Sequence, residues 1–301
     1  MSKVDIVIAS YNGERYIKEQ IESIFSNTLF NECVNKIIVS DDNSSDKTVS
    51  IVEGFSDERL ILVNNQGGKG VINNFQNALC LTESKYVILS DQDDLWTKDK
   101  IEVLLNGIKS TESNSMPCLF FSDLIVIDEI GNVICNSFWE YQGLDPNLIN
   151  NKADLIFQNV SPGCAMIVNR ELLNLSLPFP KDIAMHDWWL LLVANTFGKV
   201  GFTYSATTLY RQHNSNVVGA TDSTIVEKLN KIKNLATTGD KGVRYTQLLA
   251  LKTISEYNSL PMEPVLIRIL GLFKSDFCYK VRSIFRIKIK TKFKLWLLFN
   301  R

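Results

Sequence analysis

Several common features are missing from this chain of 301 residues. No run of about 18 apolar residues appears, so a membrane-spanning helix is not expected, and the opening residues read as a strand rather than as a signal peptide. The six cysteines form no C-x-x-C pair and there are only two histidines, which leaves a zinc site poorly supplied with ligands. The loops G-x-x-x-x-G-K-[ST] and G-x-G-x-x-G, which usually cradle a bare phosphate, are also absent. These absences predict a cytoplasmic protein with reduced cysteines.

The remaining composition is that of a soluble globular protein, with 45% hydrophobic and 22% charged residues. The total charge of −1 hides one asymmetry, because residues 268–301 contain ten basic residues and one acidic residue, a local charge of +9. Aromatic residues are interleaved with this charge, and Phe293, Trp296 and Phe299 are expected to bury apolar area in a membrane interface, which favours attachment to the anionic cytoplasmic face of a membrane. Nucleic acid is not an expected partner, since no nucleic-acid motif accompanies the charge. A helix that packs against the body and keeps a solvated basic face is the open alternative.

Strand and helix patterns alternate along the first part of the chain. Apolar runs predict strands at 4–9, 36–40, 60–63, 86–90 and 119–127, and helical spacing of apolar residues predicts helices at 13–27, 46–55, 70–81 and 97–108. This repetition predicts a parallel α/β sheet with helices on both faces. The pattern loosens after residue 127, returns with a helix that begins at "HDWW", and is helical again from about residue 224.

The segment "KYVILSDQDDLW" carries a predicted strand directly into three carboxylates, Asp91, Asp93 and Asp94. Two like charges about 4 Å apart cost roughly 4 kcal/mol at an effective dielectric near 20. A hard divalent cation, Mg²⁺ or Mn²⁺, would offset this repulsion by binding carboxylate oxygens. The alternative is that the acids cap the following helix. One cap needs only one side chain, so this explanation suits Asp94 better than Asp91 and Asp93 together.

Polar residues also follow the other predicted strands. In open α/β sheets a ligand binds beyond the carboxyl ends of the strands, so these residues are expected at one edge of the sheet. The polar groups that follow the first four strands are Ser10-Tyr11-Asn12, residues 41–46, residues 64–68 and residues 91–94. An edge this acidic is expected to hold a diphosphate through a bridging metal ion, because carboxylates repel a bare phosphate.

Six motifs resemble those of family 2 glycosyltransferases, particularly the bacterial rhamnosyltransferase-like enzymes of surface polysaccharide assembly. In chain order they are "IVIASYNGERYIKEQIESI", "IIVSDDNSSDKT", "YVILSDQDDLW", "SPGCAMIVNREL", "HDWW" and "YRQH". The resemblance covers about residues 3–220. It implies a GT-A fold of the α/β class with a mainly parallel central sheet over residues 1–220, followed by a helical C-terminal extension with the basic tail over residues 221–301. It also implies inverting transfer of a sugar from a nucleoside-diphosphate donor.

The same resemblance implies the donor-binding and metal-binding residues. Asp91-Gln92-Asp93 resembles the D-x-D motif of the family, with Asp93 as the direct metal ligand and Asp91 at the donor ribose or the metal. Tyr11 is expected to stack on the nucleotide base, and Asp42 is expected to accept the N3–H of that base. The other residues expected beside the donor nucleotide are Ser10, Asn12, Glu14 and Gln92.

The groups that carry the reaction follow from the second half of the motifs. Asp187 resembles the general base that takes the proton of the acceptor hydroxyl, although this chain has His186-Asp187 where the family usually has Glu-Asp. A simple cap of the helix that begins there is the alternative for Asp187. The other residues expected around the sugars, the metal and the diphosphate are Gly163, Cys164, His186, Trp188, Arg211 and, as a further metal ligand, His213. Asn43 stands where the family often has glycine, and asparagine tolerates the positive φ of such a position.

The resemblance implies a nucleoside-diphosphate sugar as donor, such as dTDP-rhamnose or a UDP-sugar, and a polyprenyl-diphosphate-linked glycan of O-antigen or capsule assembly as acceptor. We expect the enzyme to meet this acceptor as a peripheral protein on the cytoplasmic face of the membrane. A dehalogenase-type phosphatase would need its nucleophile after the first strand, where Ser10-Tyr11-Asn12 stands, and a nucleotidyltransferase would need a glycine-rich basic loop there. A membrane-docked, sugar-nucleotide-binding module without turnover is the non-enzyme alternative, and the presence of Asp187 argues against it.

Overall fold

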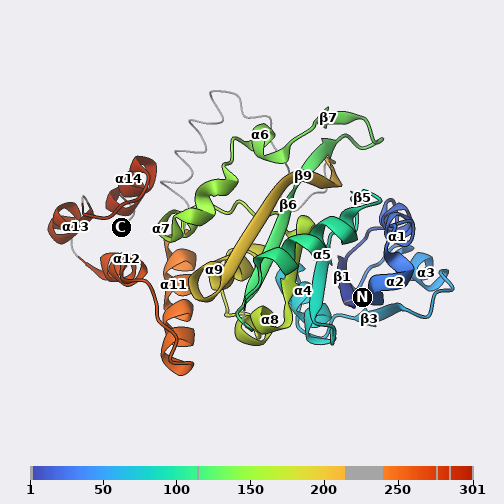
Figure 1. The fold of residues 1–301 in the computed structure, drawn as a ribbon, viewed down its shortest axis with the longest axis horizontal. Coiled ribbons are helices and arrows are strands. Elements are labelled where there is room, and N and C mark those ends of the chain that lie inside the picture. Colours follow the sequence, from blue (N-terminus) through green and yellow to red (C-terminus); the bar gives the residue numbers. More distant parts are fainter. Residues whose placement is uncertain (1–2, 114, 214–239, 276, 285, 300–301) are drawn as a thin grey trace.

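The computed structural model describes residues 3–113, 115–213, 240–275, 277–284 and 286–299. Within these residues, nine strands form one sheet in the order β3-β2-β1-β4-β8-β6-β9-β5, and β7 pairs with β6 (Figure 1). The strands are β1 Val4–Ser10, β2 Val34–Asp41, β3 Leu60–Asn64, β4 Tyr86–Ser90, β5 Leu95–Trp96, β6 Cys118–Ile127, β7 Val133–Cys135, β8 Met166–Asn169 and β9 Lys199–Arg211. The first four strands run parallel to one another, and β6 runs parallel to β9, while β8 is antiparallel to β4 and β6.

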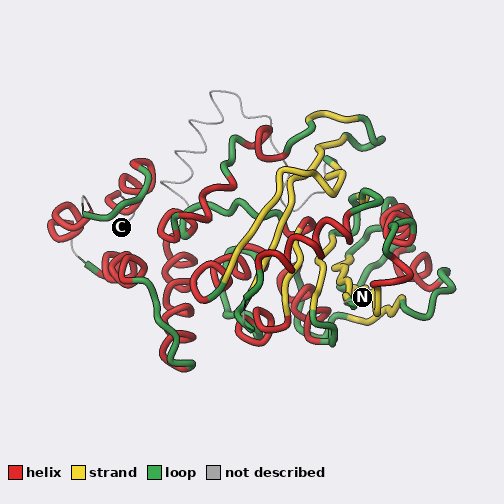
Figure 2. The backbone as a smooth tube through the Cα atoms, viewed as in Figure 1, coloured by secondary structure: helices red, strands yellow, loops and turns green. Residues whose placement is uncertain are grey.

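Helices lie on both faces of this sheet and at one end of the molecule (Figure 2). They are α1 Ile17–Phe25, α2 Phe30–Cys33, α3 Thr48–Glu53, α4 Val71–Cys80, α5 Lys100–Thr111, α6 Phe138–Gln142, α7 Lys152–Leu155, α8 Arg170–Ser176, α9 His186–Phe197, α11 Asp240–Tyr257, α12 Pro264–Lys274, α13 Phe277–Ile284 and α14 Thr291–Phe299. Short 3-10 turns occupy Pro146–Asn150 and Gly163–Ala165. The α/β fold with a mainly parallel central sheet is confirmed.

The first strand shows why the sheet is buried on both faces. Successive side chains of a strand point to opposite faces. Ile6 and Ile8 therefore join the core under α1, α2 and α5, while Val7 joins the core under α4, α8 and α9. All three side chains are fully buried. An unbroken apolar run is the pattern expected of such a strand.

The predicted strands agree with the structure within two residues, but the helix at 13–27 begins later, at Ile17. The reason is tertiary. The backbone N–H groups of Asn12, Gly13 and Glu14 donate hydrogen bonds to side chains of the loop that follows β2, so these residues form a connecting loop instead of a first helical turn.

The C-terminal helices belong to the main apolar core rather than to a separate unit. Leu266 and Ile269 of α12, Ile284 of α13 and Phe293 of α14 are buried in the same cluster as α9, and Phe293 stacks on Phe157 with ring centroids 5.0 Å apart. The predicted insertion of Phe293 into a membrane is therefore wrong, because its ring is only 3% exposed. The side chains of Trp296 and Phe299, and the predicted domain boundary near residue 220, lie outside the part of the structure that is described.

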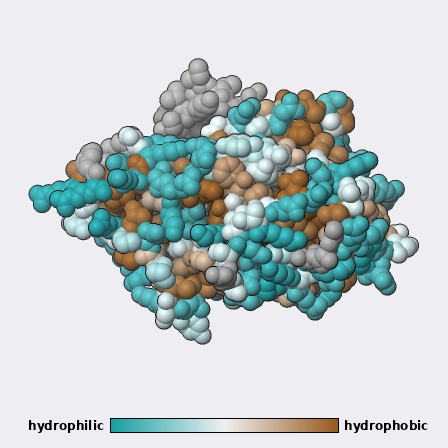
Figure 3. All heavy atoms as spheres, in the orientation of Figure 1, coloured by the Kyte–Doolittle hydropathy of each residue, from teal (hydrophilic) through white to brown (hydrophobic). Residues whose placement is uncertain are grey.

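Basic side chains remain on the outer surface of these helices. Arg282, Arg286, Lys288, Lys290 and Lys292 are exposed, whereas the intervening Ile287 and Ile289 are buried. Figure 3 shows hydrophilic side chains over this end of the molecule. The alternative of packed helices with a solvated basic face thus holds for the described residues. Of the helices that the structure describes, none has the length and apolar character needed to cross a bilayer.

Candidate active site

The loop after β1 presents an aromatic ring at the carboxyl edge of the sheet. Tyr11 is 56% exposed, and Gln92 holds its backbone from the loop after β4. The Gln92 Oε1 accepts a hydrogen bond from the Tyr11 N–H at 3.0 Å, and the Gln92 Nε2 donates to the Tyr11 carbonyl at 3.0 Å. Gly13 packs so closely on this amide that an added Cβ would overlap it. These bonds fix the backbone of Tyr11, and its ring remains exposed at the edge of the sheet.

The other residues predicted at the donor nucleotide connect the first two loops and brace them. Ser10 is fully buried and donates to the Asp41 carboxylate at 3.0 Å, while Asn12 and Glu14 accept hydrogen bonds from backbone N–H groups after β2. The two carboxylate oxygens of Asp42 accept from the Asn65 amide and the Gly70 N–H at 2.8 and 2.7 Å. Asn43 has φ of 64°, so the expected left-handed conformation at this position is confirmed.

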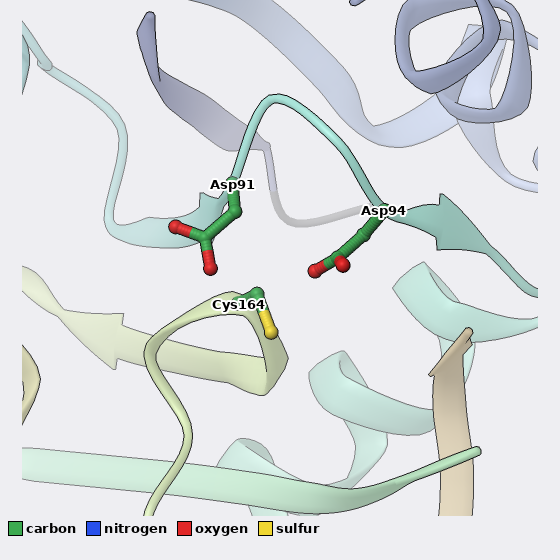
Figure 4. Close-up of side chains that lie close together, drawn as sticks. All are labelled: Asp91, Asp94 and Cys164. Carbon is green, nitrogen blue, oxygen red and sulfur yellow. The ribbon is translucent and has the colours of Figure 1, made fainter. Parts of the chain in front are cut away.

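The acidic loop after β4 places two carboxylates against the turn before β8. Figure 4 shows Asp91 and Asp94 extending toward Cys164, and one ligand atom from each of the three residues lies within 4.8 Å of the others. Burial raises the pKa of Asp91 well above its ordinary value, and the neighbouring carboxylates Asp94, Asp93 and Asp187 raise it further. Burial and the carboxylate of Asp93 raise the pKa of Asp94 to about 7. The crowding inferred from the sequence is therefore present in three dimensions.

Asp94 does not cap a helix, so that alternative is wrong for this residue. Its side chain is 1% exposed and accepts a hydrogen bond from the Arg211 N–H at 3.1 Å. Asp99, five positions further along the chain, is the residue that precedes α5. Asp94 therefore connects the acidic loop to the end of β9.

Asp93 pairs with the histidine predicted as its co-ligand. The Asp93 Oδ2 lies 2.9 Å from His213 Nε2, which follows β9 in the chain. Arg211 braces this pair, because its guanidinium donates to the Asp93 carbonyl at 3.0 Å and to the Glu19 carboxylate at 2.9 Å. The predicted contact of Arg211 with a diphosphate stays a prediction.

The residues of this edge fit a hard divalent cation. Asp91, Asp93 and Asp94 offer carboxylate oxygens, and His213 offers an imidazole nitrogen beside Asp93. Mg²⁺ and Mn²⁺ prefer such oxygen-rich sites. Burial keeps the Cys164 thiol protonated by raising its pKa well above the ordinary value, so the thiol is a poor ligand for these ions. A cation here would also offset the repulsion that raises the pKa of Asp91.

Asp187 lies in the first turn of α9, and hydrogen bonds hold both of its carboxylate oxygens. Its Oδ1 accepts from the Trp188 N–H at 2.6 Å and its Oδ2 accepts from the Asn159 amide at 3.1 Å. Burial nevertheless raises the pKa of Asp187 to about 6. Asp187 lies beside Gly163, and the next residue, Cys164, is grouped with Asp91 and Asp94, so the predicted base lies close to the acidic loop.

The remaining pocket residues surround Asp187. Gly163 is so close that an added Cβ would lie 3.3 Å from the Asp187 Cβ and 3.1 Å from His186 Nε2. Trp188 is partly buried and its indole N–H donates to the Leu155 carbonyl at 2.7 Å, whereas Trp189 is fully buried core. The loop needs glycine at position 163 because a side chain would crowd His186 and Asp187.

Two residues of the site were not predicted from the sequence. Lys100 is fully buried, and its ammonium donates to the Cys164 carbonyl and to Thr208 Oγ1, both at 2.6 Å. Burial lowers the pKa of Lys100 to about 8. In the sequence it reads as an ordinary charge on a helix. Asn159, the donor to Asp187, could have been suspected only from its position just before Ser161-Pro162-Gly163.

Residues 5–173 match the protein family described as glycosyl transferase family 2. The chain is 32% identical over 235 residues to the dTDP-rhamnosyl transferase RfbG of Shigella flexneri, a match that covers 71% of this chain and 74% of the relative. It is 29% identical over 237 residues to the UDP-Glc:alpha-D-GlcNAc-diphosphoundecaprenol beta-1,3-glucosyltransferase WfaP of Escherichia coli, which covers 78% of this chain and 87% of that protein.

Solved structures of low sequence identity share the fold. The crystal structure of Staphylococcus aureus TarS residues 1–349 with UDP-GlcNAc has a TM-score of 0.58 at 16% identity, covering 98% of this chain and 78% of that one. The mannosyltransferase PcManGT of Pyrobaculum calidifontis, solved with GDP-Man and Mn²⁺, has a TM-score of 0.56 at 14% identity, covering 99% and 85%. Together with the family match over residues 5–173, these findings show that the chain belongs to glycosyl transferase family 2 and is a glycosyltransferase of the GT-A fold.

Proposed function

We propose that this enzyme transfers a hexosyl group, such as rhamnose from dTDP-rhamnose or a sugar from a UDP donor, with inversion to a polyprenyl-diphosphate-linked glycan of a surface polysaccharide. The observation that carries the proposal is the buried carboxylate of Asp187, whose pKa burial raises to about 6 and which lies beside Gly163, next in the chain to the Cys164 that contacts the acidic loop after β4. Relatives named for dTDP-rhamnose and for a diphosphoundecaprenol acceptor support the choice of donor and acceptor classes.

The reaction needs a nucleophile, a base and a leaving group in line. The acceptor hydroxyl oxygen forms a bond to C1 of the donor sugar, the bond from C1 to the diphosphate oxygen breaks, and the hydroxyl proton passes to Asp187. A carboxyl of pKa about 6 is ionised at neutral pH and still more basic than an ordinary aspartate, which suits a general base. The Asn159 amide orients its Oδ2, and the Trp188 N–H orients its Oδ1.

The donor would be held at the edge formed by the first four strands. Tyr11 stacks on the base, and Asp42 accepts from it while Asn65 and Gly70 fix the carboxylate. Asp93, Asp91 and His213 would hold Mg²⁺ or Mn²⁺, which, when bound, neutralises the departing diphosphate. Solved structures of the same fold that contain Mn²⁺ support this choice of ion.

The acceptor lipid requires the enzyme to work at a membrane surface. The exposed Arg282, Arg286, Lys288 and Lys290 supply the attraction, since each basic residue near an anionic surface contributes about 1 kcal/mol. Attachment through these charges alone is reversible and salt-sensitive, because the Debye length shortens to roughly 3 Å at 1 M salt. This proposal replaces the predicted burial of Phe293 in the bilayer.

Nucleotide release tests the proposed function. The full chain is incubated with Mn²⁺ and, separately, with dTDP-rhamnose, UDP-glucose and UDP-GlcNAc, with and without a GlcNAc-diphosphoundecaprenol acceptor. Release that requires one donor, and that increases with the acceptor, supports transfer. If a donor binds but the chain releases no more nucleotide than the Asp187→Asn variant does, the protein is instead a sugar-nucleotide-binding module without turnover.

A further inference from the structure

His186 is a buried imidazole whose polar atoms have no partner in the described protein. It is the first residue of α9, it is 4% exposed, and neither Nδ1 nor Nε2 makes a hydrogen bond to any residue that the structure describes. Buried polar atoms are almost always paired, because leaving them unpaired forfeits the hydrogen bonds that water would supply. An unpaired ring beside a catalytic carboxylate therefore indicates a partner that arrives with the substrate.

The ring is held in a defined orientation. It stacks on Phe75 of α4 with ring centroids 3.9 Å apart and an interplanar angle of 23°. Its Nε2 faces the turn at Gly163, where an added Cβ would lie 3.1 Å from this nitrogen and 3.6 Å from Asp187 Oδ2. The Nε2 nitrogen and the base thus both lie beside Gly163, where a side chain would contact them both.

The charge of the ring restricts what it can bind. Burial lowers the pKa of His186 to about 3, so the imidazole is neutral during catalysis and offers one N–H donor and one acceptor. A neutral ring does not attract a diphosphate. His186 also falls outside the metal-ligating group of Asp91, Asp94 and Cys164 found among the described residues. A hydroxyl group, which both donates and accepts, matches this ring.

We propose that His186 binds one hydroxyl group of a sugar next to the reacting bond and so selects the sugar that this enzyme uses. The proposal rests on the proposed function and adds a specificity-determining residue to it. The hydroxyl belongs either to the donor sugar or to the acceptor sugar, and the two sources have the same chemistry. A neutral ring at this position adds no charge to a site that already contains Asp91 and Asp187.

The test compares the full chain with His186→Phe, which keeps an aromatic ring but removes both polar nitrogens, and His186→Gln, which keeps a donor and an acceptor. The matched control is Asn195→Ala, which removes a hydrogen bond to the Ile149 carbonyl at the other end of the same helix. Calorimetry with Mn²⁺ gives the Kd for dTDP-rhamnose, UDP-glucose and UDP-GlcNAc and for the nucleoside diphosphates alone. Nucleotide release is measured with water and with the GlcNAc-diphosphoundecaprenol acceptor.

We expect His186→Phe to lower kcat/KM for transfer about fivefold to tenfold, the usual effect of losing one neutral hydrogen bond, and His186→Gln to retain more activity than His186→Phe. If the hydroxyl is on the donor, the Kd for the sugar nucleotide rises while the Kd for the nucleoside diphosphate is unchanged. If it is on the acceptor, donor binding and release to water are unchanged while the acceptor KM rises. The Asn195→Ala variant should match the unmodified chain.

The proposal is overturned if a folded His186→Phe variant equals the unmodified chain in donor Kd, release to water and acceptor KM. If His186→Phe has a lower melting temperature, its loss of activity is attributed to folding, and the His186→Gln variant then decides the question. A His186→Gln variant of normal stability that loses as much activity as His186→Phe also overturns the proposal. If the unmodified chain releases no nucleotide from any donor, the proposed function fails instead. In that case an unchanged Kd of His186→Phe both for the sugar nucleotide that binds best and for the GlcNAc-diphosphoundecaprenol acceptor would still refute the role of His186.

Discussion

Replacing Asp187 by asparagine should lower activity and raise stability at the same time. The variant keeps the shape of the side chain but removes the proton acceptor, so we expect turnover to fall by about 10² to 10⁴. Donor affinity should stay nearly unchanged. Burial raises the pKa of Asp187 from 3.8 to about 6, so the ionised carboxylate destabilises the native state by up to about 3 kcal/mol.

The sign of the pH effect follows from the raised pKa. The native state of Asp187 holds its proton more tightly than the unfolded state, so its contribution to stability is complete below about pH 4 and is lost as the pH rises through about 6. The Asp187→Asn variant should therefore have the higher melting temperature at pH 8, and this difference should vanish near pH 4. In the unmodified enzyme, kcat/KM should fall about tenfold between pH 7 and pH 5, because a group of pKa about 6 is then mostly protonated.

Asn159→Ala is the matched variant for the pH measurements on Asp187. It removes one hydrogen bond that lowers the pKa of Asp187, so the acid limb of the kcat/KM profile should move to higher pH, by about one pH unit. Initial rates of nucleotide release and thermal denaturation, both recorded from pH 4 to pH 9, give all of these quantities. Near-normal turnover of Asp187→Asn, or an acid limb that Asn159→Ala leaves in place, would refute the assignment of Asp187 as the base.

Three other outcomes are expected. Asp93→Ala should abolish the Mn²⁺ dependence of donor binding in calorimetry, since it removes the partner of His213; equal Mn²⁺ dependence would exclude Asp93 as a ligand. Gly163→Ala should lower turnover by about tenfold to a hundredfold, because the new Cβ crowds His186 and Asp187. The control is Gly271→Ala, whose new Cβ meets nothing within 4 Å. It should leave activity unchanged and stabilise α12 by about 0.5–1 kcal/mol. Replacing Arg286, Lys288 and Lys290 by glutamine should reduce sedimentation with phosphatidylglycerol vesicles at low salt without changing donor binding; equal sedimentation would exclude this surface as the attachment site.

The positions of β1 to β4 and of β6 were readable because these strands are apolar runs that end in polar residues, whereas β9 was missed because its sequence mixes polar and apolar residues. Tyr86–Ser90 agrees with its prediction at both ends, since a strand buried on both faces is apolar along its whole length. The late start of α1 was not readable, because it depends on hydrogen bonds from the loop after β1 to Ser44, Asp46 and Thr48. The tail was misread at Phe293 because periodicity shows that a helix has an apolar face but not what covers it.

The sequence by itself determined strands β1 to β4 and β6 and the acidic loop after β4, because these depend on local pattern and on residue chemistry, while the candidate base and the histidine ligand came from the resemblance to family 2 glycosyltransferases. Only the tertiary structure decided how these groups act on one another. It buried Lys100 against the carbonyl of Cys164, placed Asn159 on the carboxylate of Asp187, and left the ring nitrogens of His186 without a partner in the described protein. Burial and the proximity of other groups determine the pKa of a side chain and whether its polar atoms find hydrogen-bond partners. Burial and proximity both arise from contacts between residues that lie far apart in the chain.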